Sequence, residues 1–451
     1  MNGSSRWIFP DVSRRRFLQL SSLTGMGIAL AACVAPAPTD GMQEEPAMEA
    51  IELRFQNWFN ESDMHTWQIG LDQFKTERPD VDMKLEYAGW GDTTSTILAG
   101  AAAGDLPDVF MASDEHVPPV ASVGLVLDLN PYIDATPDIN VDDFAAGVSR
   151  GFNFWGRWWG FPYDQSTWGI YYNKGMFDEA GIPYPPTEGQ TQWSLDEFVE
   201  AAAALTKPDG EQWGTQINGG QYLNSAFIYS AGGRNYDDDG RECLISSPES
   251  ASALQWMVDL VYKHKVAPTA AELAGSGGIN YFASGLVAME LNGQWSLQSK
   301  NAEVEFDFDI GFLPIGAIQS TVTGGSGFCC SNDSEYPDAA WEFLASYTSS
   351  DTLAEMVGRP GRGIPARWSA TPAYLEAGGK AEHPGAFVEQ LSWAFNDRAT
   401  LASPQFNDSW SRHYGAIYDT GEGDIAAALE LIQEETNEAL AEKWAAVTIE
   451  V

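Results

Sequence analysis

Large aromatic side chains occur where the sequence predicts that strands and helices end. Four tryptophans stand out in this respect: Trp58, Trp90, Trp295 and Trp410. A flat indole face beside hydrogen-bonding groups suits a ligand whose apolar C–H faces are edged by hydroxyls, as in a sugar. Large aromatics also fill protein cores, so core packing remains the alternative for each of these residues.

Polar side chains that suit ligand contact lie near the same predicted ends. Asp114 and Glu115 come directly after a predicted strand at 108–113, at the end where open α/β sheets form a crevice. Gly325 can bring backbone N–H groups close to a ligand because it lacks a side chain. Arg362 can pair with a hydroxyl or a carboxylate. The alternatives are a solvated acidic pair, a flexible glycine loop and a structural ion pair.

No motif indicates a metal, a nucleotide or another cofactor, and we expect none. The five histidines are dispersed, and there is no G-x-x-x-x-G-K-[ST] phosphate loop. The acidic run at 235–240 is similar to a calcium loop, but Ser246 stands where such a loop needs a bidentate Glu. We therefore interpret it as a polar turn. We interpret three cysteines as structural thiols: Cys243, Cys329 and Cys330.

Length and charge limit the class of protein. A chain of 451 residues exceeds one compact core, so two lobes are expected. Lys and Arg total 24 against 64 Asp and Glu, giving a net charge of −40. Such a field repels phosphate backbones and anionic lipid, which excludes nucleic-acid binding and membrane binding by charge. Four cysteines in this length exclude a disulfide-rich scaffold.

The N-terminal residues 1–32 are typical of an export signal rather than of a folded element. The sequence SRRRFL at 13–18 is a twin-arginine pattern, and a short apolar run follows it and ends in LAAC at 30–33. The ending is similar to a bacterial lipobox, which predicts that Cys33 is lipidated and becomes the first mature residue. The alternative is a plain membrane anchor with an incidental cysteine. Residues 33–50 then form a linker, and the folded body sits outside the cytoplasm on its lipid.

Strand and helix signals alternate from residue 51 onward and predict an α/β protein. Residues 51–55 and 81–87 alternate apolar and polar positions as half-buried strands do, and residues 108–111 suit a central strand. Three helix starts carry capping or proline signals or helical spacing of apolar residues: those at Ser194, Ser247 and Asp424.

Several ordered fragments together resemble family 1 extracellular solute-binding proteins, the maltose-binding-protein class of ABC importers. The fragments cover most of residues 51–445 in the family's order. They are GDLPDV at 104–109, FPYD at 161–164, GIYYNK at 169–174, MFDEAG at 176–181, FASGLVAMELNGQW at 282–295, GGSG at 324–327, PDAAWEF at 337–343 and GIPAR at 363–367.

The resemblance implies a two-lobed, periplasmic-binding-protein-like α/β fold with three crossing segments and a ligand cleft between the lobes. One lobe would hold residues 51–162 plus 293–346, and the other 163–292 plus 347–451. Tyr163 and Asp164 would lie on the first crossing, where hinge and site coincide. Trp295 and Trp410 fall where the family places stacking aromatics.

The implied function is capture of a mono- or oligosaccharide and its delivery to an ABC permease with a separate ATPase. We expect a monomer without enzymatic activity. Two alternatives stay open: an exported glycoside hydrolase, which also uses aromatic platforms and paired carboxylates, and the same fold binding a cationic solute such as a polyamine. The sequence does not reveal which sugar binds.

Overall fold

The structure is a computed structural model that describes residues 50–59, 64–396 and 400–449. The predicted export signal, most of the predicted linker and the predicted lipidation site Cys33 lie outside these residues. No helix among the described residues is long and apolar enough to cross a membrane.

The first lobe is built on a five-stranded sheet in the order β2-β1-β3-β13-β6. Its strands are β1 (Ile51–Asn57), β2 (Val81–Tyr87), β3 (Val109–Ser113), β6 (Phe161–Pro162) and β13 (Ser326–Cys330). Strand β1 runs parallel to β2 and β3, whereas β13 is antiparallel to β3 and to β6. All five residues of β3 are buried, as predicted for a central strand.

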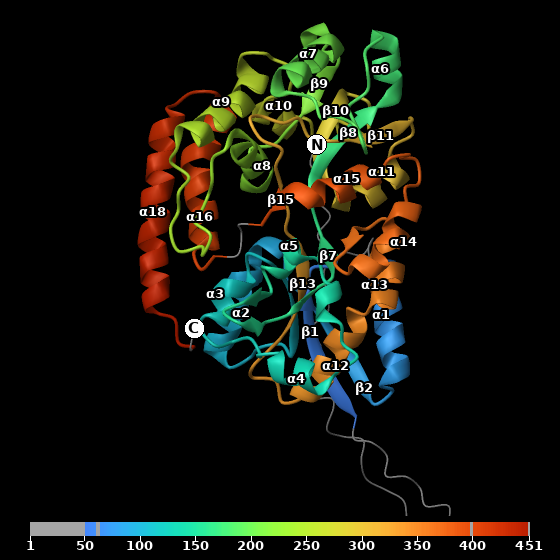
Figure 1. The fold of residues 1–451 in the computed structure, drawn as a ribbon, viewed down its shortest axis with the longest axis vertical. Helices are drawn as coiled ribbons and strands as arrows, with labels where there is room; N and C mark the ends of the chain where they lie inside the picture. The colour runs from blue at the N-terminus through green and yellow to red at the C-terminus, as the bar shows by residue number, and fades with distance from the viewer. Residues whose placement is uncertain (1–49, 60–63, 397–399, 450–451) are drawn as a thin grey trace, which may run out of the picture. The chain divides into compact units, whose positions relative to one another are not determined.

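Helices cover this sheet and close the first core. They are α1 (Met64–Glu77), α2 (Thr93–Ala103), α3 (Val117–Ala121), α4 (Asn130–Ala135), α5 (Ala146–Ser149), α12 (Pro337–Tyr347), α13 (Ser350–Leu353) and the π-helical turn η5 (Ala354–Gly358). Phe343 on α12 packs edge-on against Phe55 of β1 and Phe74 of α1, at 5.3 and 5.1 Å between ring centroids. These contacts join α1 and α12 side by side next to the sheet (Figure 1).

The second lobe is built on a four-stranded sheet in the order β11-β8-β10-β9. Its strands are β8 (Trp168–Asn173), β9 (Trp213–Gln216), β10 (Val287–Gly293) and β11 (Phe308–Gly311). Strand β8 is antiparallel to both of its neighbours, and β9 runs parallel to β10. Every residue of β8 is buried, so this strand is the centre of the lobe.

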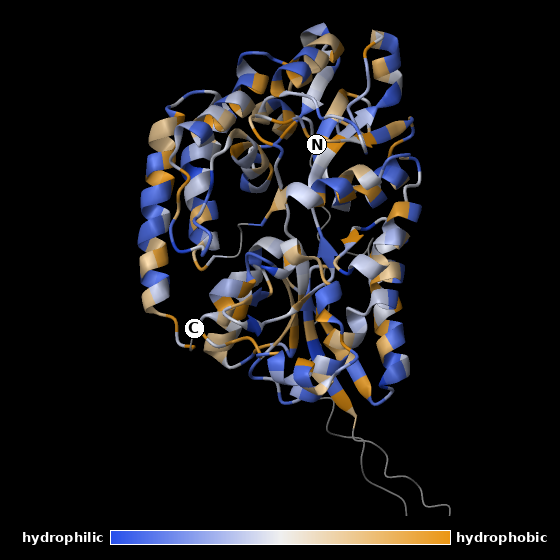
Figure 2. Ribbon diagram, in the orientation of Figure 1, coloured by the Kyte–Doolittle hydropathy of each residue, from blue (hydrophilic) through white to orange (hydrophobic). Residues whose placement is uncertain are grey.

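Two hydrophobic clusters surround the second sheet. The helices packed there are α6 (Lys174–Ala180), α7 (Leu195–Leu205), α8 (Gln221–Ala231), α9 (Pro248–Tyr262), α11 (Leu297–Glu303), α14 (Thr371–Glu376), α15 (Gly385–Gln390), α16 (Ser403–Trp410), the π-helical turn η8 (Ser411–Gly415), α17 (Ala416–Thr420) and α18 (Ile425–Ala445). The peripheral helices alternate hydrophilic and hydrophobic residues along their length (Figure 2), as helices that cover a core on one side do.

Short elements connect and flank these layers. The remaining strands are β4 (Asn153–Phe154), β5 (Arg157–Trp158), β7 (Asp164–Gln165), β12 (Thr321–Val322), β14 (Ile364–Pro365) and β15 (Ala394–Phe395). The remaining helices are η1 (Trp90–Asp92), η2 (Val141–Asp143), η3 (Pro208–Gly210), α10 (Ala270–Gly275), η4 (Gln294–Ser296), η6 (Trp368–Ala370) and η7 (Leu391–Trp393). Strand β7 lies along the chain between β6 of the first sheet and β8 of the second, and it pairs with β14.

The local signals in the sequence are confirmed. Ser194 and Glu197 form a reciprocal capping box at the start of α7. The Ser247 side chain caps α9, and the Asp424 side chain caps α18. In the acidic run at 235–240, the Asp237 carboxylate accepts bonds from the N–H groups of Arg241 and Glu242, so this run is a polar turn. Cys243, Cys329 and Cys330 are buried free thiols.

Two of the predicted lobe boundaries need correction. The resemblance implies that residues 293–346 belong to the first lobe, but β11 pairs with β8 in the second sheet, so the chain crosses between β11 and β13 rather than before residue 293. It also implies that residues 347–451 belong to the second lobe, but Leu353 and Ala370 belong to the first core. Both sheets bury apolar strands, so an apolar run such as β11 does not indicate which sheet it joins. The remaining boundaries stay a prediction.

Candidate ligand-binding site

A cavity of about 810 Å³ is lined by residues from both lobes and from the segments between them. The first lobe contributes Trp58, His65, Trp90, Ser113, Tyr163, Gly325 and Ser326; the second contributes Tyr222, Trp295, Ser296, Gln298, Ser299, Ala302 and Glu303; the connecting segments contribute Asp164, Ser166 and Arg362. We call this the first cavity. Its volume is in the range, about 300–1,000 Å³, of sites that hold a drug-sized molecule.

The first-lobe wall presents two indole rings beyond the carboxyl ends of parallel strands. Trp58 follows β1, and Trp90 begins η1 just after β2. Between them lies His116, whose ring centroid is 6.4 Å from that of Trp58 and 5.3 Å from that of Trp90. Trp90 remains 47% exposed, so its ring has free surface for a ligand. The carboxyl ends of β1, β2 and β3 thus position this wall, as open α/β sheets do.

On the second-lobe side, Tyr222 and Trp295 line the first cavity, and Trp168 packs against both of them. Trp295 stacks on Tyr222 with 6.2 Å between centroids and 19° between planes. Trp168 meets the Trp295 ring edge-on at 5.0 Å and the Tyr222 ring at 5.7 Å. A Cβ at Gly293 would lie 2.1 Å from the Trp295 ring. Only glycine therefore lets this ring fold back over the end of β10.

Asp164 on β7 is the charged group at the crossing between the lobes. Its Oδ1 accepts a bond of 2.8 Å from the N–H of Ser326 at the start of β13. Burial raises the pKa of Asp164 to about 6, although the Ser326 N–H and the charge of Arg362 act in the opposite direction. The carboxylate thus ties the crossing strand to the first sheet while lining the cavity.

A second cavity, of about 740 Å³, adjoins the first through two shared residues. Trp90 and Tyr222 line both cavities. The other lining residues include Glu115 from the first lobe and Trp168, Gly219, Ala270, Asn407, Trp410, Ser411, Tyr418 and Asp419 from the second. The Nδ2 of Asn407 on α16 donates to Glu115 Oε2 at 3.2 Å, which joins the two sides of this cavity.

The structure brings most of the predicted ligand-contacting residues to one of the two cavities. The first cavity includes Trp58, Trp90, Tyr163, Asp164, Trp295, Gly325 and Arg362, and the second includes Trp90, Glu115 and Trp410. Contact with a ligand stays a prediction for each of them.

Three of the predicted ligand-contacting residues make structural contacts. Asp114 is fully buried and lines neither cavity, because its Oδ2 accepts from Asn396 Nδ2 at 2.9 Å and its N–H donates to the Gly325 carbonyl. Trp410 is 3% exposed and its indole N–H donates to the Gly219 carbonyl. A Cβ at Gly325 would lie 2.2 Å from the Asp164 carbonyl oxygen, so this glycine permits close packing of the crossing strand.

Several lining residues were not found by sequence reasoning. Tyr222 is the most informative, because it lies in the first turn of α8 and its hydroxyl is 2.8 Å from Ser166 Oγ. On α11, Leu297 and Lys300 are buried while Gln298, Ser299, Ala302 and Glu303 line the first cavity. The helical spacing of these four lining residues can be read from the sequence, but a polar helix face usually meets solvent. No signal in a single sequence separates the two cases.

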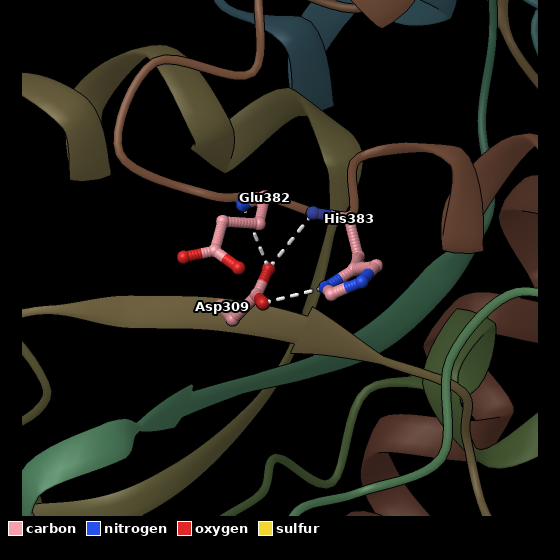
Figure 3. A group of neighbouring side chains, drawn as sticks. All are labelled: Asp309, Glu382 and His383. Carbon is pink, nitrogen blue, oxygen red and sulfur yellow. Dashed lines mark hydrogen bonds and ion pairs between the residues drawn. The ribbon is translucent and has the colours of Figure 1, made fainter.

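One cluster of potential metal ligands occurs among the described residues: Asp309, Glu382 and His383 (Figure 3). Asp309 Oδ1 accepts from the N–H groups of Glu382 and His383, each at 3.0 Å, and Oδ2 lies 2.7 Å from His383 Nδ1. Glu382 pairs with Lys174 at 3.0 Å. These contacts use the lone pairs that a metal ion would need. The cluster therefore holds residues 382–383 against β11.

Comparison with known proteins gives a family and a fold. Residues 59–353 match the family described as bacterial extracellular solute-binding proteins. The maltotriose-binding protein of Pyrococcus abyssi is 22% identical over 66% of this chain and 63% of its own length. The arabinooligosaccharide-binding protein of Halalkalibacterium halodurans is 25% identical over 62% of each chain. The chain thus spans just under two thirds of the length of these relatives.

A solved structure has the same architecture. The ABC substrate-binding protein Lmo0181 from Listeria monocytogenes, in complex with cycloalternan, superposes with a TM-score of 0.78. The superposition covers 87% of this chain and 100% of the other, at 22% identity. This likeness confirms the predicted two-lobed α/β fold.

Proposed function

The chain belongs to the bacterial extracellular solute-binding protein family, and on that premise we propose that it captures a carbohydrate in the first cavity. The sugar binds without being cleaved, and closure of the lobes around it prepares it for delivery to an ABC permease. Two relatives are named as binding maltotriose and arabinooligosaccharides, and these names support a carbohydrate ligand.

One observation carries this proposal: aromatic faces from both lobes line one cavity together with polar groups. Trp58 and Trp90 lie on one side and Tyr222 and Trp295 on the other, beside Ser166, Gln298 and Ser299. Indole and phenol faces stack on the C–H faces of a sugar ring, while hydroxyl, amide and charged groups bond its hydroxyls. A ligand that touches both walls favours the closed state by its difference in affinity.

The proposal includes a place in the cell and partners. The lipid on Cys33 anchors the protein at the outer face of the cytoplasmic membrane after export by the twin-arginine route. Membrane contact is through this lipid alone, because a chain with a net charge of −40 is repelled by anionic lipid. The protein acts as a monomer, and the partner ATPase supplies the energy of transport.

The test is a thermal-shift and calorimetry panel on the purified folded body. The compounds tested are neutral mono- and oligosaccharides, putrescine, spermidine and glycerol phosphate. We expect a neutral sugar to raise the melting temperature, because a ligand that binds only the native protein must stabilise it. Stabilisation by a polyamine or glycerol phosphate alone, or release of reducing ends from the oligosaccharides, would overturn the proposal.

A pair of tryptophan variants localises the binding. Trp295→Ala should weaken sugar binding by about 1–3 kcal/mol, the scale of a lost aromatic contact. Trp368→Ala is the matched control, since Trp368 is 45% exposed on η6 and lines neither cavity. Equal affinities of the two variants for sugar would remove Trp295 from the site.

A further inference from the structure

We propose that the ligand is a neutral oligosaccharide of at least three units that spans both cavities. This inference rests on the proposed function and adds to it the length and charge of the ligand. It is based on the junction between the two cavities, where the side chains of Trp90 and Tyr222 line both of them.

The two cavities form one extended surface. The aromatic cluster of Trp168, Tyr222 and Trp295 runs along both, because Trp295 lines the first cavity, Trp168 the second and Tyr222 both. Centroid distances of 5.0 to 6.2 Å join these rings without a break. Trp90 lines both cavities from the first lobe. A chain of sugar rings can therefore pass between Trp90 and Tyr222 with an aromatic face available on each side of the junction.

Volume sets the length of the ligand. Each cavity, at about 810 and about 740 Å³, is by itself large enough for one drug-sized molecule. A disaccharide fits within one cavity, so it leaves the other to water. A chain of three or more units can pass Trp90 and Tyr222 and contact side chains in both cavities.

Charge sets the kind of sugar at one end. The second cavity contains the carboxylates Glu115 and Asp419, and Asn407 donates to the first of them. Carboxylates repel a uronic acid and accept hydrogen bonds from neutral hydroxyls. The end of the chain in the second cavity is therefore a neutral sugar.

The experiment measures affinity against chain length by calorimetry. The probes are neutral series built from glucose, arabinose, xylose or mannose, each from the monosaccharide to the pentasaccharide, and the galacturonate series. We expect the dissociation constant to fall at least tenfold between the disaccharide and the trisaccharide or tetrasaccharide of one neutral series, and the galacturonates to bind at least tenfold more weakly. A monosaccharide or disaccharide that binds as tightly as the longer chains, or a galacturonate that does, overturns the inference.

A matched pair of variants assigns the gain to the second cavity. Ala270 on α10 lines this cavity, whereas its neighbour Ala271 is exposed and lines neither. Ala270→Trp should remove the increase in affinity between the disaccharide and the longer sugars but keep the affinity for the disaccharide. Ala271→Trp should bind sugars of every chain length as tightly as the unchanged protein does. Ser411→Trp, at a lining position that is exposed, replaces Ala270→Trp if that variant does not fold.

The outcomes separate this inference from the proposed function. A short sugar that binds fully, or a gain with length that persists in Ala270→Trp and Ser411→Trp, contradicts the two-cavity ligand and leaves carbohydrate capture intact. If no sugar of any length binds, the proposed function is wrong and the inference falls with it.

Discussion

At the scale of single residues, Asp164 combines the features that make a buried carboxylate sensitive to pH. Its pKa is raised from 3.8 to about 6, mainly by burial. The folded state therefore binds the proton more tightly than the unfolded state does, and this contribution to stability is lost as the pH rises from about 3.8 through 6. At pH 7 the folded protein holds an ionised group in a site that disfavours its charge.

We predict that Asp164→Asn stabilises the folded protein at neutral pH. The amide oxygen can still accept from the Ser326 N–H, and the cost of the buried charge disappears. Urea unfolding should show a gain of up to about 3 kcal/mol at pH 7 that shrinks toward zero at pH 4. Asp82→Asn, at an exposed carboxylate 70% accessible, serves as the control. Parallel stability curves for Asp164→Asn and the unchanged chain between pH 4 and 7 would contradict this prediction.

Local signals predict the place of a residue at a cavity where that residue directly follows a recognisable strand. Trp58, Trp90 and Glu115 follow strands whose alternation or apolar run is visible in the sequence, and the structure places all three at a cavity. Tyr222 could not be found, because its place at the junction depends on how α8 packs against the second sheet. Asp114 stands beside Glu115 in the sequence, but successive side chains point different ways, and this one is enclosed by Asn396.

At the scale of elements, α11 depends on a buried ion pair. Lys300 on its inner face pairs with Glu290 of β10, with side chains 4% and 11% exposed. The Lys300 ammonium also lies 4.9 Å from the Tyr171 ring and 4.8 Å from the Phe282 ring, which is within reach of cation–π attraction. The opposite face of α11 lines the first cavity, so this pair positions part of the site.

We predict that Lys300→Met destabilises the protein by about 3–5 kcal/mol, because it leaves the Glu290 charge buried without a partner. The double variant Lys300→Met with Glu290→Gln should recover most of the loss, since the Gln side chain is neutral and still accepts from Asn292. Lys84→Met is the control: Lys84 is 53% exposed and 3.7 Å from Glu86, and such pairs contribute about 0–1 kcal/mol. Chemical unfolding checks all three, and a double variant no more stable than Lys300→Met would show that the charge is not the cause.

Elements were predictable where the signal is local. The capping box at Ser194 and the strand at 81–87 depend on neighbouring residues, and both form. The half-buried alternation expected of that strand holds at Val81 but not at Leu85 and Tyr87, which are exposed. The lobe of β11 depends on which buried strand it pairs with, and its partner β8 lies more than a hundred residues earlier. The sequence of neither apolar strand indicates which distant strand it pairs with.

At the scale of the whole molecule, the path of the chain between the sheets sets what can move. The chain leaves the first sheet after β6 and enters the second at β8, and it returns between β11 and β13. Each sheet has its own buried core, so bending is easier in these connecting segments than within a lobe. Residues from both lobes line each cavity. A ligand that touches both sides therefore stabilises the arrangement in which they approach.

We predict that a saturating neutral sugar reduces the radius of gyration of the folded body in small-angle scattering. The reduction should follow the calorimetric binding curve, because closure takes its free energy from the difference in sugar affinity between the two states. Ala302→Trp is the matched control: Ala302 is exposed and lines the first cavity. An indole there occupies part of the space that the sugar needs, so the same sugar concentration should leave the radius unchanged. A constant radius in the unchanged protein, while calorimetry shows the cavity to be occupied, would mean that the sugar enters a rigid site. The aromatic walls would then account for affinity alone, and recognition by a permease would have to depend on the bound sugar rather than on the shape of the closed protein.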